Sequence, residues 1–413
     1  MKIAHFSWEF PPVIYGGLGT FAAEITQKQE YFGNEITVFS LNQDNKYKTY
    51  EKWNGIDLYR PKILDLTQTF NLFAAHELRM WGTNLKFFAD VVSYNTLSAS
   101  QLVNVLVKKN NKTFDIIDAH DWLGIIGGMV IKKELNIPLV FHVHSTEYGR
   151  SIGDGSPTIK NIEYDGGQVA DRVITVSYAM KEELEKLGFP SENIRVCWNG
   201  VDPTKYDPNK VSEDEKKQLR RRYGISENEN MLFFIGRLVT VKGIYNLVKA
   251  MPSIVEDYPN TKLVVLGIGD MEGELKSLAS ELNIQDKIIF RTEFIDEKER
   301  IVHYATSDCV ILPSTYEPFG IVCTEAMSMG KPIVVGANGT SGFREQIIPD
   351  GDKKCGIHIN PHDPKDIAWG VKEILKLEDK GRLLGKNARE RVLDTFSWDS
   401  VTKRTIDIYN ELI

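Results

Sequence analysis

Short apolar runs alternate with helical segments along the whole chain, and this alternation constrains the fold more than any other feature. The runs expected to form strands in the first half are residues 3–8, 36–39, 115–119, 139–143, 173–176 and 194–197. Those in the second half are residues 231–235, 262–266, 288–290, 309–312 and 333–335. Helical segments lie between them, for example residues 182–187, 241–256 and 271–282. Strands that alternate with helices indicate βαβ units, so an α/β protein with parallel sheets is predicted.

A polar stretch separates two such series. Residues 199–203 end the first, and a charged helix over residues 212–223 opens the second. A chain of 413 residues has room for two or three domains. We therefore predict a first domain over residues 1–207 and a second over residues 208–396, followed by a last helix over residues 397–413. The helical segment 70–106 is rich in Phe, Trp and Leu, which favours core packing over a surface for a polymer, membrane or partner.

Charge and hydropathy exclude several classes of protein. The net charge of −7 divides into −4 up to Asp207 and −3 after it, so neither half is basic and nucleic acid is not expected as a partner. No apolar run reaches the roughly 18 residues of a membrane-spanning helix. Residues 3–8 read as a strand, not a signal peptide, so a cytoplasmic protein is expected. The four cysteines form no C-x-x-C pair, and Cys197 and Cys309 are expected to be buried thiols.

A glycine-rich turn follows the first expected strand. Gly16 and Gly17 precede Leu18 and open a helix, where backbone N–H groups favour an anion such as phosphate. The spacing matches neither a Rossmann fingerprint nor a Walker loop. A phosphate site and a tight turn without a ligand are both compatible with this pattern.

Two cations leave the first strand of the second half. Arg237 and Lys242 lie five positions apart in a loop that enters a helix. They can clamp a diphosphate and stabilise the charge that develops on it as a leaving group. The simpler interpretation is that they are solvated surface charges.

Two carboxylates follow a later strand at a spacing of eight. Glu317 lies in the strand-to-helix loop, and Glu325 is expected about two turns along the helix. Open α/β sheets bind ligands at the carboxyl ends of their strands. The pair is therefore placed to hold the two ends of one polar ligand, such as a sugar and a ribose.

Polar groups also follow two expected strands of the first half. Asp121 and His144 are interpreted as groups that contact sugar hydroxyls, and no metal is expected because the histidines lack a metal-ligand spacing. Trp122 is interpreted as a core residue rather than a sugar platform. In the second half, Thr340 lies in a glycine-containing loop, either as a phosphate ligand or as a helix N-cap.

Taken together, these motifs resemble the retaining GT-B glycosyltransferases, most closely the glycogen and starch synthases and related archaeal and bacterial α-glycosyltransferases. The resemblance covers essentially the whole chain. It rests on Gly16-Gly17-Leu18, His120-Asp121-Trp122, Asn199-Gly200-Val201-Asp202, Gly236-Arg237 with Lys242-Gly243, and Glu317-Pro318-Phe319-Gly320 with Glu325. It implies two Rossmann-like domains that face a deep cleft, with the last helix packed back on the first domain.

The resemblance also implies roles for single residues. Arg237 and Lys242 would bind the diphosphate of a nucleotide-sugar donor, Glu317 the donor sugar and Glu325 the ribose hydroxyls. The expected donor-binding set is completed by Gly16, Gly17, Leu18, Phe319, Gly320, Ile321 and Thr340. His144 and Asp121 would line the donor-sugar site.

The implied reaction is a retaining, metal-independent transfer of glucose from ADP- or UDP-glucose to an α-glucan, without a cofactor. The acceptor hydroxyl would attack from the same face, and the leaving phosphate would take its proton. Ile14 stands where bacterial glycogen synthases carry Lys, which keeps a small acceptor such as glucose 1-phosphate open as an alternative. A sugar-nucleotide epimerase is a further alternative, because such enzymes can share the fold.

Overall fold

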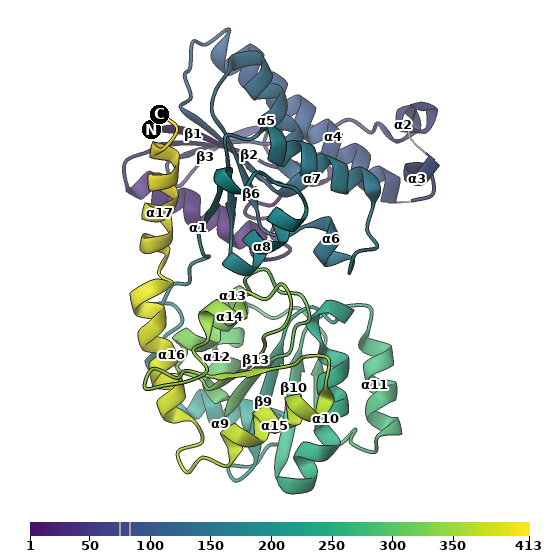
Figure 1. Cartoon of the computed structure of the whole chain (residues 1–413), viewed down its shortest axis with the longest axis vertical. Coiled ribbons are helices and arrows are strands. Elements are labelled where there is room, and N and C mark those ends of the chain that lie inside the picture. Colours follow the sequence, from purple (N-terminus) through teal and green to yellow (C-terminus); the bar gives the residue numbers. More distant parts are fainter. Residues whose placement is uncertain (74–75, 82–83) are drawn as a thin grey trace. The chain divides into compact units, whose positions relative to one another are not determined.

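The computed structural model describes residues 1–73, 76–81 and 84–413, which form two compact units. One unit consists of Met1–Asn199 together with Trp398–Ile413, and the other of Gly200–Ser397. Each unit is built around its own β-sheet with helices packed against it (Figure 1).

The sheet of the first unit has eight strands in the order β3-β4-β2-β1-β5-β6-β7-β8. The strands are β1 (Lys2–Phe6), β2 (Glu35–Phe39), β3 (Tyr50–Trp53), β4 (Ile56–Tyr59), β5 (Ile116–His120), β6 (Leu139–Val143), β7 (Arg172–Thr175) and β8 (Ile194–Val196). β3 pairs antiparallel with β4, and the other pairs are parallel. The chain builds outward from β1 in one direction and then in the other, so a topological switch point lies between β1 and β5.

The first unit also contains helices. They are α1 (Gly17–Tyr31), α2 (Thr67–Phe73), α3 (His76–Arg79), α4 (Asn84–Ser100), a π-helical continuation (Gln101–Val107), α5 (Asp121–Leu135), α6 (Glu147–Arg150), α7 (Pro157–Val169), α8 (Tyr178–Lys186) and α17 (Trp398–Asn410). Among them, α2 and α3 project away from the sheet (Figure 1). The last helix, α17, packs beside α1 (Figure 1), and a 2.7 Å ion pair joins Lys28 to Asp399. Its apolar face, including Ile408 and Tyr409, is buried in the core of this unit.

The sheet of the second unit has six parallel strands in the order β11-β10-β9-β12-β13-β14. The strands are β9 (Asn230–Ile235), β10 (Thr261–Leu266), β11 (Ile288–Arg291), β12 (Cys309–Leu312), β13 (Ile333–Gly336) and β14 (Ile357–Ile359). The helices are α9 (Glu213–Arg222), α10 (Ile244–Asp257), α11 (Glu272–Glu281), α12 (Glu297–Thr306), α13 (Ile321–Ser328), α14 (Phe343–Gln346), α15 (Pro364–Leu375) and α16 (Arg382–Thr395). The switch point of this sheet lies between β9 and β12.

All eleven runs expected to be strands are strands, with ends that differ by at most two residues. β3, β4 and β14 were missed. β3 is a sheet edge whose sequence Tyr-Glu-Lys-Trp carries little apolar signal, and β14 has only three residues. The segment 70–106 is divided among several helices, and residues 74–75 and 82–83 within it lie outside the described part of the chain.

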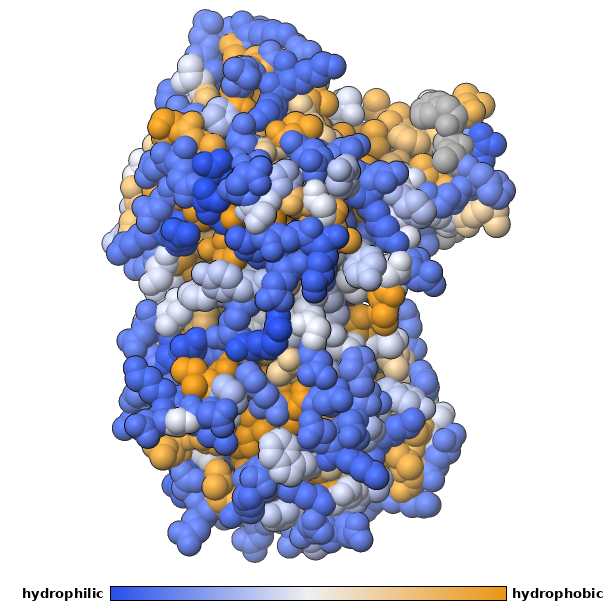
Figure 2. Space-filling model, viewed as in Figure 1, coloured by the Kyte–Doolittle hydropathy of each residue, from blue (hydrophilic) through white to orange (hydrophobic). Residues whose placement is uncertain are grey.

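The segment 70–106 supplies both core and surface. Leu85, Phe88 and Tyr94 are buried, as core packing requires, whereas Leu72 and Met80 are among the most exposed apolar side chains of the chain. Figure 2 shows apolar side chains gathered over the α2–α4 region. Elsewhere the four cysteines are buried free thiols. No helix among the described residues combines the length and the apolarity needed to cross a membrane.

Candidate functional site

Two loops meet at the switch point of the second sheet. One follows β9 and contains Arg237 and Lys242, and the other follows β12 and contains Glu317. Gly243 brings them together: its φ is +67°, and a Cβ there would lie 1.9 Å from the carbonyl oxygen of Pro313. A residue with a side chain would push these loops apart, so the site depends on glycine at this position.

Lys242 and Glu317 form an ion pair between Nζ and Oε2. The hydroxyl of Ser314 donates to the same carboxylate oxygen at 3.1 Å. Both charged side chains are mostly buried, at 19% and 9% exposure. A buried carboxylate that keeps a cation and a hydroxyl as partners is held in one orientation.

Arg237 lies beside this pair in sequence but points to solvent. It is exposed, and its guanidinium forms no ion pair with any residue that the structure describes. An unpaired arginine at the ligand edge of a parallel sheet is available to an anion.

Glu325 has a separate set of partners. It is 5% exposed and is the fifth residue of α13, so the expectation of two turns into the helix was wrong and one turn is correct. The hydroxyls of Tyr206 and Tyr304 donate to its two oxygens at 2.8 Å each, and Arg300 lies 3.3 Å away. Both oxygens of this carboxylate are therefore engaged within the unit.

The loop between β12 and α13 is hydrogen-bonded to the loop after β13 and to α14. The backbone N–H of Glu317 donates to the carbonyl of Thr340 at 3.0 Å, and Gln346 donates to the carbonyl of Phe319 at 2.7 Å. Phe319 is buried, Gly320 caps α13 with φ +88°, and Ile321 is its first residue. Thr340 is half-buried and is not a helix cap, because Gly342 occupies that position before α14. The N-cap alternative for Thr340 was therefore wrong.

A third glycine loop at this edge was missed in the sequence. Gly267 and Gly269 follow β10, and a Cβ on either would collide with the backbone of the loop after β9, at 1.8 Å from the carbonyl oxygen of Gly236 and 2.3 Å from that of Leu238. The signal was present as a Gly-x-Gly directly after an expected strand. These glycines set the path of the backbone that carries Arg237.

The glycine turn of the first unit already holds a negative charge. The backbone N–H groups of Tyr15 and Gly16 donate to Oε2 of Glu9 at 2.8 and 3.0 Å. Gly16 and Gly17 are exposed at the start of α1, and Leu18 is half-buried. Glu9 was not singled out from the sequence, because nothing local indicates that its carboxylate turns back onto a loop six residues later.

Asp121 and His144 are brought into direct contact. Oδ1 of Asp121 accepts a hydrogen bond from the backbone N–H of His144 at 2.7 Å. Asp121 has φ +51°, a left-handed conformation at the turn from β5 into α5. Burial raises the pKa of its carboxyl to about 6, against the opposing effect of Arg150 and the backbone N–H donors. Asp121 thus fixes the backbone at the end of β6, where the half-buried His144 begins the next loop.

A histidine cluster lies behind His144. The rings of His142 and His144 are stacked with centroids 4.6 Å apart, and Phe21 packs its edge against both. Within the described part of the chain, two groups of side chains lie close enough to hold a metal ion: His120 with His142 and His144, and His5 with Asp118 and His120. Trp122 is buried against Phe88, which confirms its core interpretation.

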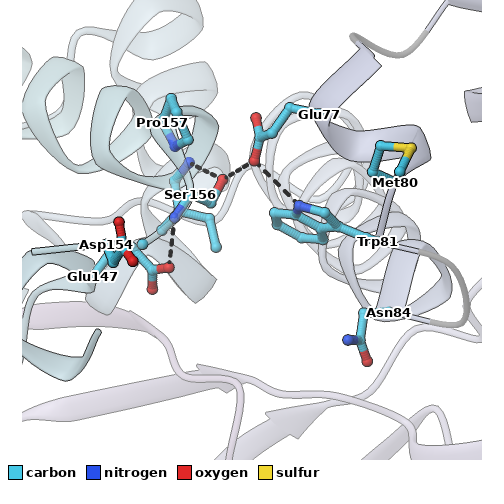
Figure 3. Close-up of a pocket in the computed structure, with 10 residues that line it drawn as sticks. Glu77, Met80, Trp81, Asn84, Glu147, Asp154, Ser156 and Pro157 are labelled. Atoms are coloured by element: carbon cyan, nitrogen blue, oxygen red, sulfur yellow. Dashed lines mark hydrogen bonds between the residues drawn. The ribbon is translucent and has the colours of Figure 1, made fainter. Parts of the chain in front are cut away.

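A pocket of about 590 Å³ opens in the first unit between α3 and the start of α7 (Figure 3). Trp81 lies on one side, where its indole N–H donates to Glu77 at 3.2 Å, and Ser156 faces it from the other side. Three carboxylates line it, those of Glu77, Glu147 and Asp154, and no lysine or arginine does so among the residues described. An aromatic ring with surrounding carboxylates suits a neutral polyhydroxylated ligand better than an anion.

The chain matches two family models that together span most of its length. Residues 15–205 match Glycosyltransferase Family 4, and residues 215–391 match Glycosyl transferases group 1. An uncharacterized glycosyltransferase of Methanocaldococcus jannaschii is 34% identical over 99% of this chain and 98% of its own length. A glycogen synthase of Mycobacterium tuberculosis is 26% identical over 99% of this chain and 94% of its own length. The chain belongs to the group 1 glycosyltransferases of the GT-B type.

Solved structures share the fold. A sucrose-phosphate synthase from Thermosynechococcus elongatus superimposes with a TM-score of 0.79 at 24% identity over 100% of this chain and 98% of that one. The catalytic domain of Arabidopsis thaliana starch synthase IV, bound to ADP and acarbose, gives 0.77 at 17% identity over 99% of both chains. Anabaena HepE in complex with UDP-glucose gives 0.75 at 19% identity over 100% of both. The expected architecture of two parallel-sheet α/β domains is therefore confirmed.

Proposed function

We propose that this glycosyltransferase moves glucose from ADP- or UDP-glucose to an α-glucan with retention of anomeric configuration and without a metal ion. The observation that carries the proposal is the pairing of Lys242 with Glu317 at the switch point of the second sheet, beside the exposed Arg237, which has no ion-pair partner among the described residues. Two cations there can hold a diphosphate while the carboxylate binds the sugar attached to it. Gly16, Gly17, Leu18, Phe319, Gly320, Ile321 and Thr340 complete the proposed donor-binding set.

The carboxylates of Glu317 and Glu325 already have partners, which supports a mechanism without a glycosidase-style nucleophile. Glu317 is ion-paired with Lys242, and Glu325 is held by two tyrosines and Arg300. A retaining glycosidase instead aims two carboxylates at the scissile bond. In the proposed reaction, the sugar–phosphate bond breaks as Arg237 and Lys242 neutralise the departing diphosphate. The acceptor hydroxyl attacks from the same face, and its proton passes to the departing phosphate.

The pocket beside Trp81 supports a neutral glucan as acceptor. The carboxylates of Glu77 and Asp154 would repel a sugar phosphate, whereas the hydroxyls of a glucan can donate to them. The third carboxylate, that of Glu147, is paired with Arg150 at 3.3 Å. The exposed Ile14, at a position where bacterial glycogen synthases carry a lysine, favours the second candidate, transfer to a small acceptor such as glucose 1-phosphate.

The proposal is tested by a donor and acceptor matrix. ADP-, UDP- and GDP-glucose are each incubated with glycogen, maltose or glucose 1-phosphate, with and without EDTA, and nucleotide release and the product anomer are followed by NMR. We expect acceptor-dependent release of ADP or UDP, an α-linked product and no effect of EDTA. Interconversion of the nucleotide-sugar without an acceptor would identify an epimerase instead.

A further inference from the structure

Three histidines of the first unit form a continuous chain of contacts from the core to the ligand edge of the sheet. Nδ1 of His5 lies 3.2 Å from Nε2 of His120, and Nδ1 of His120 lies 3.1 Å from Nε2 of His144. His5 on β1 and His120 on β5 are fully buried, whereas His144 is half-buried at the end of β6.

The inner end of this chain is anchored on the last helix. Nε2 of His5 lies 2.7 Å from Oε1 of Gln29 on α1, and Nε2 of Gln29 lies 3.5 Å from the hydroxyl of Tyr409 on α17. That hydroxyl donates to Oδ2 of Asp118. Although burial opposes ionisation of Asp118, the surrounding histidines hold its pKa below the usual value, so the carboxylate only accepts.

This anchor determines which group donates and which accepts in each hydrogen bond between Tyr409 and His144. The single proton of Tyr409 is donated to Asp118, so the Tyr409 oxygen accepts from the amide nitrogen of Gln29. The amide oxygen of Gln29 therefore faces His5 and accepts from its Nε2–H. A neutral imidazole carries one proton, which leaves Nδ1 of His5 as an acceptor.

The same step repeats along the chain. His5 accepts at Nδ1 from His120, and His120 accepts at Nδ1 from Nε2–H of His144. The rings are neutral because burial lowers the pKa of all three, that of His120 to about 3. His144 is left with its proton on Nε2 and a bare Nδ1.

We propose that Tyr409 is a positioning residue which, through Gln29, His5 and His120, fixes His144 as the Nε2–H tautomer, so that Nδ1 of His144 accepts a hydrogen bond from a donor-sugar hydroxyl. The contact with the sugar rests on the proposed function. The tautomer itself does not, because it follows from the hydrogen bonds within the unit.

Imidazole tautomers are read directly by NMR of protein labelled with ¹⁵N-histidine. His144 is assigned by the signal lost in His144→Gln, and we expect it to be protonated at Nε2 in the wild type. Tyr409→Phe keeps the ring but removes the hydroxyl, which frees the Gln29 amide to turn over, so His144 should populate both tautomers. Gln29→Met breaks the next link and should have the same effect if Tyr409→Phe does not fold.

Tyr94→Phe is the matched control. Tyr94 is a fully buried tyrosine of the same unit, and its hydroxyl donates to the backbone carbonyl of Phe39 at 2.9 Å, away from the histidines. This variant should leave the histidine spectrum unchanged. A spectrum altered equally by Tyr94→Phe would assign the change to general loss of packing and overturn the proposal.

Kinetics then test the contact with the sugar. Tyr409→Phe and Gln29→Met should lower turnover about tenfold, the effect of one hydrogen bond, with unchanged affinity for free nucleoside diphosphate. Three results would overturn the proposal. They are protonation of His144 at Nδ1 in the wild type, an unchanged tautomer in both variants, and one equivalent of bound metal that is lost in His5→Asn. Absence of sugar transfer by the wild type, with the expected tautomers observed, would count against the proposed function and in favour of the tautomer assignment.

Discussion

The ammonium group of Lys242 and the carboxylate of Glu317 are ion-paired, although they follow different strands and lie 75 positions apart in sequence. The pairing joins a cation suited to a phosphate with a carboxylate suited to a sugar. It places both at the edge of the sheet where its strand order reverses. Each residue therefore orients the other before any ligand arrives.

Removal of the cations should abolish most sugar transfer. We expect Arg237→Ala and Lys242→Ala each to reduce turnover by about 10²- to 10³-fold, because each removes charge stabilisation of the leaving diphosphate. Lys276→Ala is the control, since Lys276 is an exposed lysine of the same unit that pairs with Glu272 along α11. Steady-state kinetics with the active nucleotide-sugar measure both. Near-normal turnover of Arg237→Ala would refute the clamp.

The positions of the proposed diphosphate and sugar ligands could be predicted from the sequence, because the patterns that mark them are local. Arg237, Lys242 and Glu317 each follow an apolar run that is a strand, and the strands are parallel, so their carboxyl ends share one edge. The glycines beside them mark turns where backbones approach closely. Fold class and strand-end placement follow from such patterns within a few residues.

The partners of Glu325 and Asp118 could not be predicted, because they are distant in sequence. Glu325 is held by Tyr206 and Arg300, and Asp118 by Tyr409, which lies 291 positions away. No periodicity or motif connects such pairs. Glu9 was missed for a different reason: it is close in sequence, but its bond to the loop depends on the three-dimensional path of the turn.

The stability of the second unit should depend on the partners of Glu325. Arg300→Met removes the cation beside the buried carboxylate of Glu325, so we expect a loss of about 1–3 kcal/mol in the free energy of unfolding. Arg222→Met is the control, because Arg222 is 52% exposed and pairs with Glu299 at the surface. Its cost should be below about 0.5 kcal/mol. Urea unfolding followed by fluorescence measures both, and equal costs would contradict a structural role for the Arg300–Glu325 pair.

The stability of the first unit should fall as pH rises through the range set by Asp121. Its pKa is raised by burial from the usual 3.8 to about 6, so between these values the folded chain retains a proton that the unfolded chain has released. The unfolding free energy contributed by this group should therefore decrease from about pH 4 to pH 6 and then level off, by about 1–3 kcal/mol in total.

Asp121→Asn isolates this effect, since an asparagine oxygen can still accept from the backbone N–H of His144. The difference between wild type and variant should follow the predicted fall, measured by urea unfolding at each pH. Glu163 contributes a similar trend, because burial raises its pKa to about 7 and the charge of Asp121 adds to that rise. Both proteins are therefore compared in a Glu163→Gln background, in which this second group is absent. Asp154→Asn, a change at an exposed carboxylate, should give a flat difference curve.

Glu9 should weaken anion binding at the glycine turn by its negative charge and strengthen it by the hydrogen bonds that hold the turn in place. Its carboxylate accepts from the N–H groups of Tyr15 and Gly16, which holds the turn, but it also places a negative charge where a diphosphate is proposed to bind. Glu9→Gln keeps an acceptor and removes the charge, so affinity for ADP or UDP should rise about two- to fivefold. Glu9→Ala removes both and should lower affinity, because the turn loses its anchor.

Isothermal titration measures the three proteins, with Glu134→Gln on the last turn of α5 as a control for the change in net charge. Equal affinities in Glu9→Gln and wild type would show that the glycine turn does not approach the phosphates.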